Sequence, residues 1–487
     1  MREIMNAIEN AKRIAGNVVV NAAMNYITNG NVERKIDDLF NIALKLAWRP
    51  CDREPILQLK SRFRDPDCPQ KKLLVNVLKS DPNWLKKAAA NFFVNSIIVG
   101  RKKTLELEKR NKMMLPFFLL IDPTERCNYR CKGCWAGNFD PCDMPYEVFD
   151  RLLCEAKELG IYLVTVSGGE PFLYKDLFKV MEKHPDMTFL FYTNGSLLAD
   201  EEFADKFVAL GNGLPCFSLE GFEERTDERR GKGAFVKVMK AMDNLRERRY
   251  PFGISCTATS QNYKEITSDE FVDAMVKKGV VLGWYFMYMP IGRDPDFEIM
   301  LKPEQRKYMW QRTTKIRNEK PIVFADFWND GPVTDGCLAG GRRYVHITAD
   351  CHVEPCAFVH FNRPEDSVRE KSLLKVLEES KLFNAMRARQ NPAYESNPMR
   401  PCWIVDRPWA LRDVVKEVSA DASEAGSIHL MDEKVAGELD RRAKAWEPVA
   451  NEIWESIQNY NKRFEKISKI AQKNIQSLDD IKEEDLH

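Results

Sequence analysis

Apolar and polar residues follow two different patterns along this chain, and the change falls near residue 113. Residues 1–112 carry apolar positions at helical spacing and few strand signals. From 113 to about 310, short apolar runs alternate with amphipathic segments. That alternation is typical of repeated βα units around a parallel sheet. We therefore predict a helical N-terminal module followed by an α/β core.

Six apolar runs in the core have the length and composition of buried strands. They cover residues 117–121, 161–166, 187–192, 214–219, 252–259 and 282–288. Six βα units form an open, partial (βα)6 barrel, in which functional residues gather at the carboxyl ends of the strands. We expect the functional site at that end.

Two further segments follow the core. Residues 311–410 contain cysteines, prolines and tryptophans with little periodicity. Residues 411–487 include a charged helical stretch, which we expect to break near Pro448 because proline removes a helical hydrogen bond. The expected organisation is therefore a basic helical module (1–112), a barrel core (113–310), a cysteine-containing extension (311–410) and a helical tail (411–487).

The net charge of +1 conceals an asymmetry, since residues 1–112 hold 22 Lys/Arg against 12 Asp/Glu. A basic module favours anionic partners such as a phospholipid surface. Its most apolar run, residues 88–100, is bracketed by basic residues. This run either lies on a membrane surface with its lysines at the level of the headgroups, or packs on the barrel.

The composition also bears on where the protein works. The first residues have no long apolar stretch of the kind found in secretory signals, and no run reaches the ~20 apolar residues of a membrane span. Thirteen cysteines in such a chain are best explained as reduced thiols, some of which bind metal. We predict a cytoplasmic protein, with attachment to the inner face of the membrane as an open alternative, and expect no nucleic-acid partner.

Three cysteines, Cys127, Cys131 and Cys134, lie within eight positions directly after the first predicted strand. Thiolates grouped in this way suit zinc or an iron–sulfur centre. A structural zinc site would need a nearby fourth ligand, for which Cys142 is the close candidate. An iron–sulfur cube held by three cysteines would instead leave one iron free to bind a small molecule.

The C-x3-C-x2-C motif after the first strand of a βα barrel resembles the radical S-adenosylmethionine (SAM) superfamily. The resemblance implies a [4Fe-4S] cluster whose open iron is chelated by the amino and carboxylate groups of SAM. It also implies reduced flavodoxin or ferredoxin as the electron donor. The protein would supply placement and exclude water while the cofactor supplies the difficult chemistry, so no catalytic side chain is assigned.

Further segments lie where the superfamily's fold needs SAM contacts. After the second strand comes "SGGEPFL", which by resemblance holds the SAM amino group and which, read alone, is a tight strand-to-helix turn. The SAM-binding residues implied are Gly168, Gly169, Glu170, Thr193, Asn194, Ser218, Glu220 and Arg230.

One position departs from the superfamily's pattern. The residue before the third cysteine is commonly hydrophobic or aromatic and packs near adenine, whereas here it is Gly133. Trp135 and Tyr129 are the candidates to replace it.

A second group of cysteines resembles the opening of the SPASM extension, an auxiliary iron–sulfur module of many radical SAM enzymes. The downstream run of four closely spaced cysteines that completes a two-cluster module is absent from the sequence, and only Cys402 follows. The resemblance implies one auxiliary [4Fe-4S] cluster held by Cys337, Cys356 and Cys402, with Cys351 as the candidate fourth ligand. Buried structural thiols or a zinc site are the alternatives.

The helical N-terminal module and the segment around "VEPCAF" resemble the tetraether and membrane-spanning lipid synthases. That resemblance implies hydrogen abstraction from an unactivated carbon of a lipid acyl chain, followed by C–C bond formation. The alternative is a SPASM-type maturase that acts on a peptide or protein, for example by forming a thioether. A non-catalytic barrel that only binds metal is a third class, against which the presence of Glu170 and the first three cysteines speaks.

Overall fold

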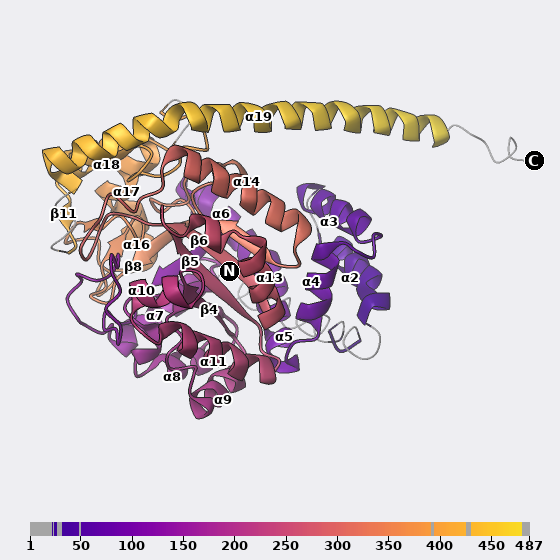
Figure 1. Cartoon of the computed structure of the whole chain (residues 1–487), viewed down its shortest axis with the longest axis horizontal. Coiled ribbons are helices and arrows are strands. Elements are labelled where there is room, and N and C mark those ends of the chain that lie inside the picture. Colours follow the sequence, from indigo (N-terminus) through magenta and orange to yellow (C-terminus); the bar gives the residue numbers. More distant parts are fainter. Residues whose placement is uncertain are drawn as a thin grey trace, which may run out of the picture.

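The centre of the molecule is one nine-stranded sheet, shown in Figure 1 for the computed structural model. The structure describes residues 22, 24–26, 32–47, 50–390, 394–424 and 430–479. The order of the strands is β7-β6-β5-β4-β3-β2-β1-β8-β9. Their bounds are β1 Phe118–Ile121, β2 Leu163–Val166, β3 Thr188–Thr193, β4 Gly213–Leu219, β5 Phe252–Ala258, β6 Val280–Met287, β7 Val323–Asp326, β8 Tyr344–Ile347 and β9 Val353–Glu354.

Strands β1 to β6 lie in sequence order, and each pairs in parallel with the next. This arrangement confirms the α/β fold class and the six strands expected from the apolar runs. Parallel pairing brings the carboxyl ends of all six strands to one end of the barrel, because each strand is followed by a crossover that returns the chain to the opposite end. The loop after β1, which carries the first three cysteines, therefore lies over that end.

Three strands from beyond residue 310 extend the same sheet. β7 pairs in parallel with β6 at one edge, and β8 pairs in parallel with β1 at the other. β9 then pairs antiparallel with β8. The region after residue 310 is therefore built onto the barrel through shared hydrogen bonds. The sequence pattern does not predict these strands, because each has at most four residues, which is too few to show a hydrophobic period.

Helices cover the outside of the sheet and form the two ends of the chain. Figure 1 shows α2 to α4 as a group beside the barrel and α19 along one edge of the molecule. The remaining elements are α2 Val32–Leu46, α3 Pro50–Arg62, α4 Pro69–Leu78, α7 Tyr146–Glu158, η2 Pro171–Leu173, α8 Leu177–Lys183, α9 Glu201–Leu210, α10 Glu223–Arg230, α11 Ala234–Glu247, α12 Tyr263–Ile266, α13 Asp269–Lys278, α14 Pro303–Glu319, α15 Gly331–Thr334, α16 Leu373–Glu379, α17 Lys381–Ala388, α18 Pro408–Val418 and α19 Glu433–Asp479, with a two-stranded sheet of β10 Phe361–Asn362 and β11 Asp421–Ala422.

One continuous helical segment crosses the amino ends of the strands. It consists of α5 (Pro82–Ala89), the π-helix η1 (Ala90–Gly100) and α6 (Arg101–Asn111). Its buried side chains donate to backbone carbonyls just before the strands: Asn91 to Met187 at 3.0 Å and Thr104 to Leu159 at 3.0 Å. One face of the apolar run 88–100 therefore packs on the barrel.

Helix α19 continues through Pro448, so the break expected there is wrong. The helix is fixed on both sides of the proline. Trp446, Ala450 and Ile453 are buried in one apolar cluster, and the Trp446 indole donates to the Met399 carbonyl at 3.0 Å. This packing outweighs the single helical hydrogen bond that proline removes.

Candidate functional site

A large cavity lies inside the barrel and opens at the carboxyl ends of the strands. Its volume is about 1420 Å³, including the open mouth. Cys127, Cys131 and Cys134 all line it from the loop after β1. We call these three residues the SAM-cluster cysteines and this space the barrel cavity. Cys142 is not among the described residues that line it, so the thiols face a cavity and not a fourth sulfur ligand.

The two glycines after β2 hold the cysteine loop in place. The Gly169 amide donates to the Thr124 carbonyl at 3.0 Å, and the Glu170 amide donates to the Arg126 carbonyl at 2.8 Å. A Cβ atom on Gly169 would lie 2.2 Å from the Arg126 carbonyl oxygen. Only glycine permits so close an approach of two backbones, and Gly168 has in addition a φ of +100°.

We expect Gly169→Ala to disrupt the site although it adds one methyl group. The atoms that this methyl group would meet belong to the backbone, so the cysteine loop must move. A shift of about 1 Å costs on the order of 10²-fold in rate, measured as formation of 5′-deoxyadenosine from SAM. Gly437→Ala is the matched control, since its Cβ meets no atom within 4 Å. Unchanged activity of Gly169→Ala would contradict this assignment.

Glu170 lies behind the wall of the cavity and joins two turns. Its carboxylate accepts the Thr193 hydroxyl at 2.8 Å and the Asn194 amide at 2.8 Å. Burial raises the pKa of Glu170 to about 7, although these two hydrogen bonds act to lower it. The Asn194 side chain in turn donates to Asn128 of the cysteine loop at 2.8 Å. Gly168, Gly169, Thr193 and Asn194 line the cavity, so the structure brings together the predicted contacts from β2 and β3.

The predicted residues after β4 are also neighbours, in an arrangement that the sequence did not reveal. Glu220 is buried and accepts from Arg229 at 2.7 Å and from Arg230 at 2.6 Å. Both arginines line the barrel cavity, as does Ser218, whereas Glu220 holds them from behind. Arg229 was missed, and the signal available was its place beside Arg230 in "DERRGKG".

The two guanidinium groups act on the thiol of Cys134. Burial raises the pKa of the Cys134 thiol, while Arg229 and Arg230 act to lower it. Burial also raises the pKa of Cys127, to about 11. Metal binding requires thiolates, so the fixed positive charges favour the ligating form at this otherwise unfavourable position.

The departure at Gly133 has a structural reason. Its φ is +57°, and a Cβ atom there would lie 2.6 Å from the ring of Tyr288. Tyr288 follows β6 and lines the barrel cavity, and its hydroxyl accepts the Asp296 amide at 2.9 Å. The aromatic ring beside the third cysteine thus comes from the far side of the barrel, together with Trp135 and Tyr129 of the loop itself.

A second cavity lies beside the first, with a volume of about 490 Å³ including its opening. Cys337, Cys356 and Cys402 line it from three separate segments of the chain. We call them the auxiliary cysteines and this space the auxiliary cavity. The structure therefore brings together the three ligands expected for an auxiliary cluster. The other lining residues are mostly apolar: Phe327, Trp328, Leu338, Ala339, Tyr344, Phe358, Val359, Pro401, Trp403 and Ile404.

Cys351, the candidate fourth ligand, lies elsewhere. It is fully buried and is not among the described residues that line the auxiliary cavity. Its neighbour is Cys142, whose pKa is raised to about 12 by burial first and then by acidic groups and the Cys351 thiol. Because β8 and β9 form a hairpin, the turn at Cys351 points to the carboxyl end of the sheet, away from Cys356.

Both cysteine groups have the donors that iron–sulfur ligands require. The amide two residues after the cysteine donates to sulfur at 3.4 Å for Cys127, Cys337 and Cys402. Backbone amides also act on the sulfurs of Cys134 and Cys356, where they lower the thiol pKa against burial. Hydrogen bonds to the sulfurs stabilise cluster thiolates and tune their potential. The residues present therefore fit two clusters with three cysteine ligands each.

The two cavities share part of their walls. Phe327, Tyr344 and Phe358 line both. The ring of Phe358 lies 5.6 Å from that of Trp135, next to the SAM-cluster cysteines, and 5.3 Å from that of Trp328. Aromatic side chains thus form an apolar partition between the two groups of thiols.

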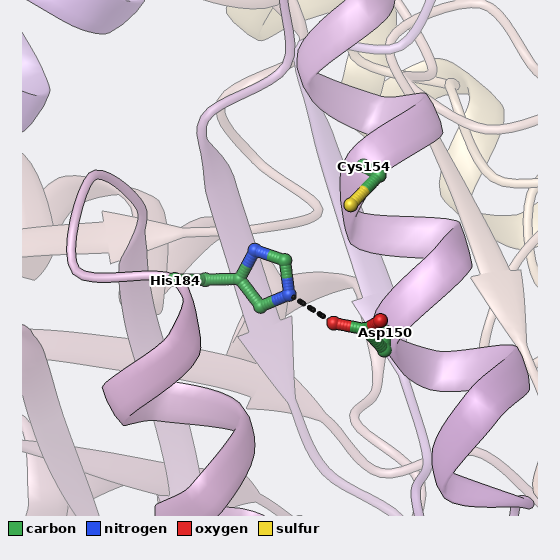
Figure 2. A group of neighbouring side chains, drawn as sticks. All are labelled: Asp150, Cys154 and His184. Atoms are coloured by element: carbon green, nitrogen blue, oxygen red, sulfur yellow. Dashed lines mark hydrogen bonds and ion pairs between the residues drawn. The ribbon is translucent and has the colours of Figure 1, made fainter.

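A third group of ligand-type side chains lies outside the barrel, on helices α7 and α8. Figure 2 shows His184 facing Asp150 and Cys154, and the donor atoms of the three lie within 4.8 Å of one another. His184 Nε2 is 2.9 Å from one oxygen of Asp150, while Lys183 pairs with the other at 2.8 Å. The carboxylate is thus already neutralised by an ammonium, and we assign this group to the packing of α7 against the end of α8.

Comparison with known proteins agrees with this geometry. Residues 121–275 match the family model described as the radical SAM superfamily. The chain is 24% identical over 302 residues to the AdoMet-dependent heme synthase of Methanosarcina barkeri, covering 56% of this chain and 85% of that protein. It is 24% identical over 312 residues to the PqqA peptide cyclase of Granulibacter bethesdensis, covering 59% and 79%.

Among solved structures, Streptococcus suis SuiB bound to precursor peptide SuiA resembles this fold with a TM-score of 0.50 and 19% identity, over 64% of this chain and 73% of that one. The match spans 85% of the length of the heme synthase but only 55% of the length of the Fe-coproporphyrin III synthase of Methanosarcina barkeri. The match covers the first three cysteines, the glycine turn after β2 and both arginines at the cavity wall. Residues 121–275 of this chain are therefore a radical SAM domain, whose cofactors are SAM and a [4Fe-4S] cluster.

Proposed function

We propose that the protein is a radical SAM enzyme with one auxiliary iron–sulfur cluster that modifies an apolar side chain of a peptide. The observation that carries this proposal is the pairing of two cavities, each lined by three cysteines and joined by a common aromatic wall. Electrons would come from reduced flavodoxin or ferredoxin, which are single-electron donors.

The bound cofactors supply reductive cleavage of SAM and hydrogen abstraction. The residues of this chain position and enclose the reactants. The SAM-cluster cysteines hold the iron, Gly168 and Gly169 fix the loop that carries them, and Arg230 offers a guanidinium for the SAM carboxylate. Glu220 pairs with both arginines through one carboxylate oxygen and so orients them, while its other oxygen is buried without a hydrogen-bond partner among the described residues and stays available to a SAM hydroxyl.

The interior of the barrel decides which substrate group can approach. Below the cysteines its lining is largely apolar and aromatic, with Leu120, Leu163, Leu190, Tyr192, Trp284 and Phe286 among the wall residues. Tyr192 and Phe286 meet edge to face with ring centroids 5.2 Å apart. Such a wall excludes water and favours an apolar group of the substrate by burial of its surface.

Two kinds of relative favour a peptide as the substrate. The PqqA peptide cyclase is named for a peptide substrate, and SuiB was solved with its precursor peptide. The auxiliary cavity is consistent with this choice, since a cluster held by its three cysteines would lie beside the substrate space, as a SPASM-type maturase would require. A peptide side chain of Leu, Ile, Val or Phe type would fit the aromatic wall.

The test is anaerobic incubation of reconstituted enzyme with SAM, a reductant and candidate precursor peptides, followed by mass spectrometry. Release of 5′-deoxyadenosine together with a peptide that has lost two hydrogens supports the proposal. Release of 5′-deoxyadenosine without change in any peptide, but with change in a lipid acyl chain, overturns the choice of substrate and leaves the radical chemistry in place.

An acyl chain is the second candidate substrate, and one observation favours it. The apolar lining extends to Phe118 at the amino end of β1, where the same ring borders a further cavity beside η1 and Arg101. An elongated apolar chain could occupy such a space along the barrel axis. New diacids of twice the chain length in hydrolysed lipids would identify this reaction, in which two chains lose one hydrogen each and join by a C–C bond.

The auxiliary cluster is tested by counting iron. We expect Cys337→Ala to lower the iron content by one cluster while 5′-deoxyadenosine formation in the absence of substrate persists, because the SAM-cluster cysteines remain. Cys351→Ala is the matched control and should keep its iron, since Cys351 lies outside the auxiliary cavity. Equal iron content in Cys337→Ala and the parent protein would reject the auxiliary cluster.

A further inference from the structure

The outer face of η1 exposes large apolar side chains to solvent. Phe92, Phe93 and Ile97 are 47%, 45% and 36% exposed, while Asn91 and Asn95 of the same helix are buried against the barrel and Val94 is buried against the N-terminal helices. We call these three exposed residues the η1 patch. The two phenylalanine rings contact each other edge to face, with centroids 5.3 Å apart. A soluble surface rarely keeps adjoining aromatic rings exposed unless they bind something.

The charge around the η1 patch indicates what it binds. From Pro82 to Leu105 the chain contains no acidic residue, and basic residues stand at both ends of the apolar run. Lys102, one turn beyond Ile97, keeps 61% of its side chain exposed. The basic residues are Lys86, Lys87, Arg101, Lys102 and Lys103. Lys87 donates to the Leu210 carbonyl at 2.6 Å, and Arg101 and Lys102 pair loosely with Glu108 at 3.7 Å and Glu106 at 3.9 Å, so anionic lipid would have to compete with these partners.

We propose that the η1 patch docks the enzyme on an anionic membrane surface, with Phe92, Phe93 and Ile97 inserted among the lipids and the flanking lysines at the level of the phosphates. Aromatic and aliphatic side chains between basic residues on one face of a helix are the features of helices that lie in the membrane interface. Each basic residue near such a surface adds attraction to anionic lipid.

The rest of the structure is compatible with this orientation. No helix among the described residues combines the length and apolarity needed to cross a bilayer. Hydrogen bonds from Asn91 and Asn95 to the carbonyls of Met187 and Asp186 fix η1 on the barrel, so the patch is presented on a rigid support. Docking does not depend on the substrate proposed above, and it would apply equally to a peptide or a lipid substrate.

The test is co-sedimentation of the full-length, cluster-loaded protein with vesicles. One set consists of phosphatidylcholine alone and the other contains phosphatidylglycerol as well. We expect binding to the anionic vesicles, weaker binding at high salt because surface charges are screened, and little binding to phosphatidylcholine. Phe92→Ser/Phe93→Ser should weaken binding about tenfold or more, since two half-exposed rings no longer insert.

Val236→Ser is the matched control, because Val236 is 57% exposed on α11 and should not contribute. Iron content and 5′-deoxyadenosine formation verify that each variant is folded. If the double serine variant fails to fold, Lys86→Glu/Lys102→Glu replaces it and should lose binding to anionic vesicles. Three results would overturn the proposal: no binding of the parent protein, undiminished binding of the variants, or a dimer in solution that the serine variant dissociates, which would show that a second copy covers the patch.

Discussion

Replacing Cys131 by alanine is expected to abolish cleavage of SAM. Cys131 is a buried member of the SAM-cluster cysteines, and with only two thiols the [4Fe-4S] cluster has no adequate support. Formation of 5′-deoxyadenosine should fall below detection, and the broad absorbance of the SAM-binding cluster should disappear. The loss is larger than for any other substitution considered, because every later step depends on this one.

Cys142→Ala is the informative control for this prediction. Cys142 would be the fourth ligand of a structural zinc site, but it lies beside Cys351 and outside the barrel cavity. Its replacement should leave iron and SAM cleavage intact. Persistent 5′-deoxyadenosine formation by Cys131→Ala, or loss of metal in Cys142→Ala, would contradict the assignment of an iron–sulfur site with one open iron.

Arg306→Ala is expected to destabilise the fold and the auxiliary site together. Arg306 pairs with the fully buried Asp406, whose carboxylate also accepts the Cys402 amide at 2.9 Å. The guanidinium lies 4.1 Å from the ring of Trp446. Removing one partner of a buried pair leaves the other charge uncompensated, which costs about 3–5 kcal/mol.

The measurement combines denaturant unfolding with iron analysis. Arg306→Ala should lower the free energy of unfolding by that amount and reduce iron content by one cluster, because the segment with Cys402 loses its anchor. Lys307→Ala is the matched control on the same helix, since its pair with the exposed Glu452 contributes at most about 1 kcal/mol. A full iron complement in Arg306→Ala would show that Cys402 does not depend on this pair.

The substrate is where the comparisons changed the interpretation. The sequence favoured an acyl chain by resemblance to lipid synthases, with a peptide as the alternative. Among the similar proteins, the PqqA peptide cyclase is named for a peptide and SuiB was solved with its precursor peptide, and we therefore propose a peptide in place of a lipid. The apolar wall of the barrel cavity suits either substrate, because burial of apolar surface does not distinguish a leucine side chain from an acyl chain.

Much of the radical SAM core follows from local sequence. The six strands could be predicted because each contains a short, mostly apolar run, and the longer helices between them, such as α7 and α11, have an apolar stripe. The SAM-cluster cysteines and the glycine turn at Gly168 and Gly169 lie in the loops after β1 and β2, and Arg230 ends the helix α10 that follows β4. Their position relative to the cofactors is therefore fixed by the parallel topology.

What the sequence by itself determined is the α/β core and the order of its ligand-bearing loops, because hydrophobic period and motif spacing are local properties. Tertiary structure alone decided which distant residues meet. It placed β7 beside β6 and β8 beside β1 in the core sheet, supplied Tyr288 beside Gly133, and gathered Cys402 with Cys337 and Cys356 while excluding Cys351. These contacts depend on packing between segments far apart in the chain, for which no local pattern exists.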